Sequence, residues 1–216
     1  MSVPAYLRDP AAIYDASFRT IREEGATALA RLPGDAHDLA IRIAHACGMV
    51  DAIGDLVVSA GVVEAGRAAL QAGAPILVDA EMVAHGVIRA RLPAGNRVLC
   101  RLNEAGVPER ARRLSTTRSA AQVDWWDDDV EGAVVAIGNA PTALFRLLER
   151  LDEGAPRPAV ILGFPVGFVG AAESKAELAA NPRNIPFATL TGRRGGSAMA
   201  AAAVNALAAG LAGAPA

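Results

Sequence analysis

The sequence predicts an α/β fold in which a mainly parallel sheet of about five strands is covered by helices on both faces. Short apolar runs with almost no charge recur through the last two thirds of the 216-residue chain. The segments between these runs are long enough to hold a helix. Strands that are buried on both faces have this composition, and their alternation with helical segments is typical of a layered α/β protein.

The first part of the chain, about 9–72, is predicted to be helical. Asp9 suits a helix cap and Pro10 suits the first helical position, so the first helix begins there and ends at Pro33-Gly34. The expected helices span about 9–32, 36–46 and 61–72.

The sheet is expected within about 73–210, and nothing separates this part from the helical part. No linker rich in Pro, Gly or Ser divides the sequence, and no repeat of fixed period occurs, so residues 1–216 are predicted to form one domain. The expected strands are Pro75–Ala80, Val98–Leu102, Ala133–Gly138, Ala159–Gly163 and Phe187–Leu190.

The composition excludes some classes of protein. The chain carries 21 Lys and Arg against 23 Asp and Glu, and it therefore lacks the basic excess of a general nucleic-acid binder. All basic residues except Lys175 are arginine, whose planar fork suits carboxylates. Cys47 and Cys100 cannot make a disulfide framework, and no signal peptide is evident, so a cytoplasmic protein is expected. The charge-free stretch 195–216 is mainly Ala and Gly, which favours a core helix over a membrane span.

Common cofactor motifs are missing. The sequence contains no dinucleotide fingerprint after its first strand, no P-loop and no G-x-S-x-G elbow, and its three histidines form no metal-binding group, so we expect no cofactor and no metal. Three turns that follow strands are rich in glycine, and free backbone N–H groups at such helix starts favour anions. A large carboxylated ligand and acid–base chemistry fit this pattern. These turns span 138–142, 163–170 and 192–197.

His45 is the candidate proton donor. It lies three residues after Arg42, so the two side chains share a helix face, and histidine titrates near neutral pH. A structural or merely exposed histidine is the alternative. Ser17 places a hydroxyl between Ile13 and Ile21 on an apolar strip, where a bond to its own helix backbone is the alternative to a ligand contact.

A second candidate group surrounds Arg118. Hydroxyl residues at 115–117 are expected to cap a helix, and Arg118 then falls in the first turn, where the helix dipole disfavours a cation. A ligand carboxylate would stabilise that arginine, and simple exposure is the alternative.

Several strings of the sequence, in order along nearly the whole chain, resemble the precorrin-8X methylmutase family of cobalamin biosynthesis. One position departs from the family pattern: Ala46 follows the histidine, where a threonine is common. The matching strings are Asp9–Tyr14 with Ser17-Phe18, Arg42–His45, Gly48–Asp51, Asp79–Val83, Thr117–Ala120, Ile137–Phe145, Gly163–Lys175 and Gly192–Ser197.

This resemblance implies a flavodoxin-like, three-layer α/β/α sandwich that works as a homodimer with its active site near the subunit interface. It also implies a cofactor-free isomerase that moves a methyl group from C11 to C12 of precorrin-8X, or of its cobalt form, to give hydrogenobyrinate. His45 matches the family's catalytic histidine. The expected substrate-binding residues are Ser17, Arg42, Thr117, Arg118, Ser119, Asn139, Arg193 and Arg194.

Two other functions stay open on the sequence alone. A non-catalytic tetrapyrrole carrier would use His45 only to bind the macrocycle or to fill space, and a generic flavodoxin-like binding domain would have no affinity for corrinoids. Turnover separates an isomerase from both, because only an enzyme changes the absorption spectrum of its substrate catalytically.

Overall fold

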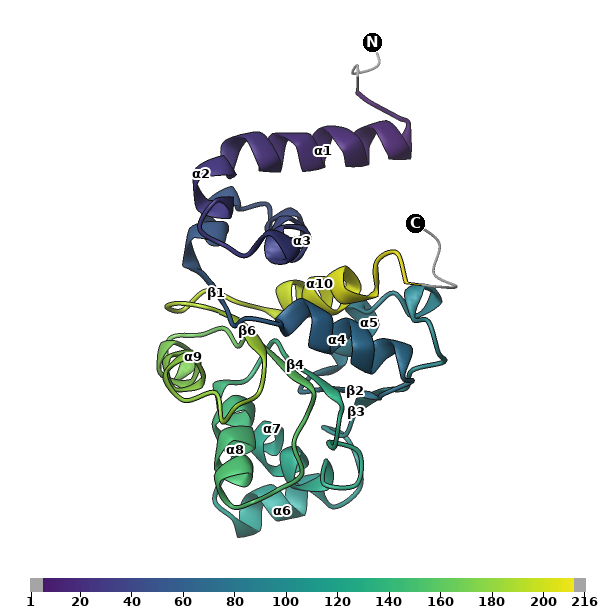
Figure 1. Ribbon diagram of the computed structural model, residues 1–216. Helices are drawn as coiled ribbons and strands as arrows, with labels where there is room; N and C mark the ends of the chain where they lie inside the picture. The colour runs from purple at the N-terminus through teal and green to yellow at the C-terminus, as the bar shows by residue number, and fades with distance from the viewer. Residues whose placement is uncertain (1–5, 212–216) are drawn as a thin grey trace, which may run out of the picture.

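The computed structural model describes residues 6–211, and its centre is a six-stranded sheet (Figure 1). The strand order is β1-β6-β5-β4-β2-β3, and every pair is parallel except β1 with β6. Without β1, this is the order of a flavodoxin-like sheet, and the predicted fold class is confirmed. The strands are β1 (Leu56–Val58), β2 (Ile76–Val78), β3 (Val98–Cys100), β4 (Val134–Ile137), β5 (Val160–Gly163) and β6 (Phe187–Leu190).

Side chains alternate across the sheet and build a core on each face. In β4, Val134 and Ala136 pack into one apolar cluster, while Val135 and Ile137 pack into the other. The helices divide accordingly, as Figure 1 shows. The first face carries α4 (Val62–Gln71), α5 (Glu81–Gly86) and α10 (Ser197–Ala208), with α3 (His37–Cys47) packed on α10. The second face carries α6 (Val107–Arg113), α7 (Arg118–Ala121), α8 (Pro141–Asp152) and α9 (Ala171–Ala180).

The short 3-10 helices connect these elements. They are η1 (Gly34–Ala36), η2 (Val50–Asp55), η3 (Arg89–Arg91) and η4 (Gln122–Trp125).

Helix α1 (Pro10–Glu24) lies outside the first helical layer, on α3 (Figure 1). It buries Phe18 and Ile21, and the Asp9 carboxylate caps it, as predicted. The prediction of one helix to about residue 32 is wrong: the helix ends at Gly25, and α2 (Ala26–Leu29) follows. A Cβ at position 25 would lie 2.7 Å from the Ile21 carbonyl oxygen, so only glycine permits this tight turn.

The part about 9–72, expected to be helical, also contains a strand that was not predicted, because β1 lies between the second and third expected helices. Leu56 pairs antiparallel with Leu190, which adds a sixth strand at the edge of the sheet beside β6. The apolar run of β1 is short and stands between segments predicted to be helical, so the apolar pattern of the sequence does not distinguish it as a strand.

The alanine-rich α10 is a core helix, as expected. Most of its residues are buried between α3 and the sheet, and no helix within residues 6–211 is long and apolar enough to cross a membrane. The last part of the charge-free stretch, 212–216, lies outside the described residues.

Candidate active site

The predicted proton donor lies at the end of α3. Ile41 and Ile43 are buried toward the core, whereas His45 is exposed in the last turn before Gly48, whose left-handed conformation (φ 68°) ends the helix. Packing of α3 on α10 therefore fixes the backbone that carries the imidazole.

Ser17 of α1 orients this imidazole. The Ser17 Oγ lies 2.8 Å from His45 Nδ1. The hydroxyl therefore bonds the imidazole and not the backbone of its own helix, which was the alternative. The rings of Phe18 and Tyr14 lie 5.4 and 5.6 Å from the imidazole, measured between ring centres. Because Nδ1 is engaged by Ser17, Nε2 is the nitrogen left to meet a ligand.

Arg42 lies beside His45 without a carboxylate partner among residues 6–211. Its Nη1 donates a hydrogen bond to the Tyr14 hydroxyl at 2.5 Å, and its guanidinium lies 5.4 Å from the Phe18 ring centre. Its buried Nε has no hydrogen-bond partner within the described chain. A buried, unpaired guanidinium N–H is costly, and a ligand carboxylate would stabilise it.

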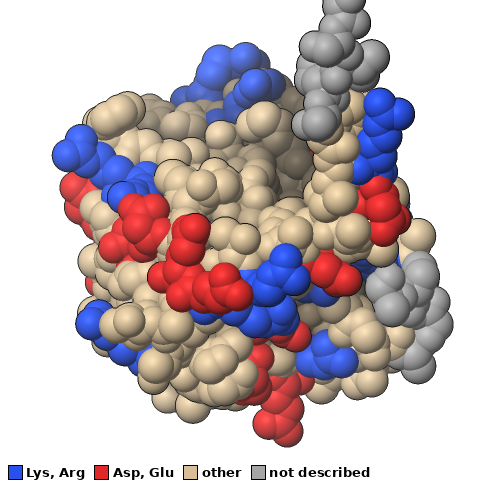
Figure 2. Space-filling model, turned by 90° about the horizontal axis from the view of Figure 1, so that it is seen from above, with Lys and Arg blue, Asp and Glu red and all other residues tan. Residues whose placement is uncertain are grey.

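A groove of about 340 Å³ opens beside these residues. Figure 2 is viewed from the side of α1 and shows a hollow in this face, with mostly uncharged walls and basic side chains at its rim. Alanines of α10 form one wall, and the segment from Gly86 to Arg91 contributes another. The small side chains leave room for a flat ligand.

Three polar residues that line the groove were not predicted as site residues: Tyr14, Arg91 and Asn205. Tyr14 precedes Ser17 by one helical turn, so their shared face was a usable signal. Asn205 accepts a hydrogen bond from Ile88 N at 2.8 Å and donates one to Gly86 O at 2.9 Å, which ties α10 to the other wall. Arg91 follows no sequence motif, and only the fold brings it to the groove.

The second predicted group lies on the other face of the sheet. Thr117 caps α7 by accepting from Ala120 N at 3.1 Å, and its Oγ1 lies 2.7 Å from Thr142 Oγ1. The capped helix start is therefore confirmed. Arg118 is exposed, has no carboxylate partner in the described part of the chain and does not line the groove; Ser119 follows it in the same short helix. One chain thus brings Ser17, Arg42 and His45 together but leaves this group apart.

The prediction of free amides at the first glycine turn is wrong. The buried Asp79, at the end of β2, accepts hydrogen bonds from the backbone N–H groups of Gly138, Asn139 and Ala140 at 2.8, 3.0 and 2.6 Å. Burial raises the pKa of Asp79, while the three N–H donors oppose that rise. The backbone N–H of Asn139 is therefore already bound by the protein itself.

The other two glycine turns bind each other. Gly167 N donates to Arg193 O at 3.3 Å, and Gly196 N donates to Phe164 O at 2.8 Å. Both amides were expected to be free, and both are engaged in holding the loops together.

The two arginines of the last turn differ. Arg194 pairs with Asp51 at 2.6 Å and approaches Asp55 at 3.6 Å, whereas Arg193 has no carboxylate partner within residues 6–211. The Arg193 guanidinium lies 5.5 Å from the ring centre of the exposed Phe168. Only Arg193 is therefore unpaired at this loop.

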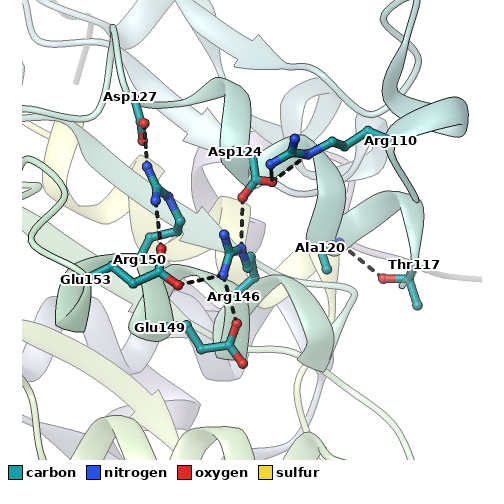
Figure 3. Close-up of polar contacts among 9 residues, drawn as sticks. All are labelled: Arg110, Thr117, Ala120, Asp124, Asp127, Arg146, Glu149, Arg150 and Glu153. Carbon is teal, nitrogen blue, oxygen red and sulfur yellow. Dashed lines mark hydrogen bonds and ion pairs between the residues drawn. The ribbon is translucent and has the colours of Figure 1, made fainter. Parts of the chain in front are cut away.

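A dense network of ion pairs occupies the second face, below α8 (Figure 3). Asp124 accepts from Arg110 at 2.6 Å and from Arg146 at 2.8 Å. Although burial raises the pKa of Asp124, these two guanidiniums lower it below its ordinary value. Arg146 also bonds Glu149 and Glu153, and Arg150 bonds Asp127 and Glu153. A second cavity of about 360 Å³ lies at Arg110 and Trp125 beside this network.

No group of three or more His, Cys, Asp or Glu within residues 6–211 is placed to hold a metal ion. His85, on α5, lies apart from the other histidines with its Nδ1 2.7 Å from the Glu81 carbonyl oxygen.

Comparisons with known proteins agree with the fold. A family model described as precorrin-8X methylmutase matches residues 12–209. The precorrin-8X methylmutases of Pseudomonas aeruginosa and a Sinorhizobium species are 64% and 59% identical over 203 residues, which is 94% of this chain and 97% and 96% of theirs. The crystal structure of a precorrin-8X methylmutase from Thermus thermophilus superposes with a TM-score of 0.81 at 39% identity, covering 92% of this chain and 94% of that chain.

Proposed function

Because the chain belongs to the precorrin-8X methylmutase family and is an isomerase of cobalamin biosynthesis, we propose that it moves the methyl group of precorrin-8X from C11 to C12, giving hydrogenobyrinate, with His45 as the proton donor. The relatives that are 59–64% identical are named for the metal-free substrate. The proposal therefore takes the metal-free macrocycle as the substrate and its cobalt form as the case to be tested beside it.

One observation carries the proposal: an imidazole that Ser17 orients lies at the edge of a groove, next to a half-buried Arg42 that has no carboxylate partner among residues 6–211 and whose buried Nε is unpaired there. The arginine suits an acetate or propionate side chain of the macrocycle. The imidazole then faces the ring that this carboxylate anchors.

The chemistry needs little more than this. The methyl group leaves C11 and bonds to C12 within one molecule, so no group is transferred to the protein. His45 Nε2 donates a proton near ring C, which makes the migration easier, and takes a proton back afterwards because substrate and product are isomers. A positioned general acid contributes about 10²–10⁴-fold, and the remaining acceleration comes from holding the ring close to its rearranging shape.

A homodimer accounts for the separated residues. Arg118 and His45 lie on helical layers at opposite faces of the sheet, so one copy does not bring both to one ligand (Figure 1). In a dimer, the unpaired Arg118 of a second copy completes the groove. Exposed apolar side chains support such an interface: Phe168 and Val169 are 87% and 88% exposed.

Mixing two inactive variants tests this arrangement. His45→Ala and Arg118→Ala chains, unfolded together and refolded, should regain activity if Arg118 acts on the groove of the other copy, because a mixed dimer holds one intact site. Absence of any recovery, with a dimer seen by light scattering, would show that Arg118 does not act on the groove of the other copy. A monomer in light scattering would contradict the proposed homodimer.

Turnover tests the reaction itself. Purified protein is incubated with precorrin-8X and, separately, with cobalt-precorrin-8, and the absorption spectra are followed. Complete conversion by a small molar fraction of protein supports the isomerase and identifies the substrate. A spectral change only in proportion to the protein added would favour the alternative, a tetrapyrrole carrier.

We also propose that the protein is cytoplasmic, because the free thiols of Cys47 and Cys100 suit a reducing compartment.

A further inference from the structure

The lone lysine of the chain is buried, and the proposed reaction does not use it. Lys175 lies in α9 and is 1% exposed. Its Nζ donates a hydrogen bond to the Arg194 carbonyl oxygen, in the loop between β6 and α10. A buried ammonium with one hydrogen-bond acceptor destabilises a fold, since its desolvation is only partly offset. A cation kept at such a position suggests a task beyond stability.

The loop that Lys175 holds leads directly to the groove. It spans Thr191–Gly196, carries the unpaired Arg193 and continues into α10, whose alanines form a groove wall. Gly195 is wedged against the chain below, because a Cβ there would lie 2.4 Å from the Phe164 carbonyl oxygen. The backbone at Gly195 therefore fits closely against Phe164, and the hydrogen bond from Lys175 to the Arg194 carbonyl oxygen holds the same loop.

The same loop is bound from its other side by η2, which follows α3. Arg194 pairs with Asp51, and Thr191 N donates to Asp55 O at 2.8 Å. The helix that carries His45 and the helix that forms the groove wall are thus joined at this loop.

We propose that the ammonium of Lys175 is a positioning group for the tetrapyrrole site, fixing the β6–α10 loop so that Arg193 and the start of α10 meet the ligand. The identity of the ligand in this inference rests on the proposed function, whereas the contacts between Lys175 and the loop do not depend on it. Lys175 itself touches no substrate.

Lys175→Met separates positioning from simple support, because methionine fills similar space without charge. We expect an unchanged or higher Tm, since a buried charge is removed, and a KM for precorrin-8X raised about tenfold with kcat changed less than about threefold. The matched control is Ser174→Ala: this buried neighbour bonds only Ala171 O of its own helix, and its loss should leave KM unchanged. A lower Tm with an unchanged KM would make Lys175 a structural support and overturn the proposal.

A single lysine also gives a direct spectroscopic readout. Labelling with 13Cε-lysine yields one side-chain signal, whose midpoint is expected near the pKa of about 8 to which burial lowers this group. Asp55 of η2 is the charged group that acts on this ammonium, and it opposes the lowering of the lysine pKa. Arg194, whose carbonyl oxygen accepts from Lys175, pairs through its guanidinium with Asp51 and Asp55. If the protonated form favours the ligand tenfold, hydrogenobyrinate must raise the lysine pKa to about 9, because linkage is reciprocal. An identical midpoint with and without hydrogenobyrinate would overturn the proposal.

Hydrogen exchange distinguishes failure of this inference from failure of the proposed function. Lys175→Met should speed amide exchange in 191–197 while α8 keeps its protection, with or without a ligand. Wild-type protein that neither binds hydrogenobyrinate nor converts precorrin-8X would contradict the proposed function, and the exchange in 191–197 still decides on Lys175. Unchanged exchange in this loop would overturn the positioning role.

Discussion

Arg42 beside the groove and the arginines of the ion-pair network on the second face are held in opposite ways. On the second face, Arg110, Arg146 and Arg150 are each bound to one or more carboxylates (Figure 3). On the first face, Arg42 lies against the rings of Tyr14 and Phe18 and donates to the Tyr14 hydroxyl, but it has no carboxylate partner within the described residues. The first arrangement satisfies each charge inside the protein, whereas the second leaves a charge for something else to satisfy. We therefore base the proposed ligand site on the missing carboxylate partner of Arg42 and not on the arginine content of the chain.

The largest expected effect is that of removing the imidazole from the groove. His45→Ala should lower kcat by about 10²–10⁴-fold, because the proton donor is lost, while the Kd of hydrogenobyrinate changes little. Stopped-flow absorption and equilibrium titration measure the two quantities. His85→Ala is the control, since that histidine is exposed on α5 and lies outside the groove. A His45→Ala enzyme with near-native kcat would refute the acid role.

A pair of arginine substitutions tests the contrast between the faces. Arg42→Met should weaken hydrogenobyrinate binding by about 10–100-fold, because a charged hydrogen bond to a carboxylate is worth about 1.5–3 kcal/mol, and it should leave the free energy of unfolding unchanged or slightly higher. Titration by fluorescence or absorption gives the affinity. Unchanged affinity would show that Arg42 does not meet the ligand.

The matched change on the other face is Arg146→Met. It leaves Asp124, Glu149 and Glu153 with fewer partners, so we expect a loss of about 1–2 kcal/mol in the free energy of unfolding and no change in affinity. Urea unfolding measures the first quantity. If this variant weakened ligand binding as much as Arg42→Met, the division between the faces would fail.

The smallest expected effect is a pH dependence of the ion-pair network. The folded-state pKa of Asp124 is lowered from 3.8, so its stabilising contribution is fully present above that pH and is lost as the pH falls through the lower folded value. Asp124→Asn should therefore flatten the acid side of the stability curve below about pH 4. Urea titrations between pH 2.5 and 6 give the curve, with Asp128→Asn as a control. An unaltered acid slope would mean that the ion pairs of Asp124 contribute little to the free energy of unfolding.

The sequence predicts the sheet better than it predicts the helical part. The five parallel strands are apolar runs, and four of them (β2, β4, β5 and β6) are fully buried, which leaves a strong signal in the sequence. The edge strand β1 is three residues long and pairs with a residue more than 130 positions away, so its formation depends on a partner that no local pattern reveals. Gly25 ends a helix for a similar reason, since its tight packing comes from the chain around Ile53.

The site divides in the same way. Arg42 and His45 share a helix face, and helical spacing was enough to pair them. The bond from Ser17 to His45 crosses from α1 to α3, and the placement of Arg91 depends on the whole α5–η3 segment, so neither follows from spacing. The occupied amides at the β4–α8 turn were missed because the acceptor, Asp79, lies some 60 residues earlier in the chain.

Asp79 has a consequence for how this fold is used. Open parallel sheets commonly bind phosphate-bearing cofactors where the strand order reverses, here between β2 and β4, and the Asp79 carboxyl group already accepts from the backbone amides at that place. These amides are therefore not free for a nucleotide or a phosphate, and the proposed ligand site lies elsewhere, beside the outer helices. Asp79→Ala would free three converging backbone amides, and sulfate or phosphate could then bind in the space that the carboxyl group leaves.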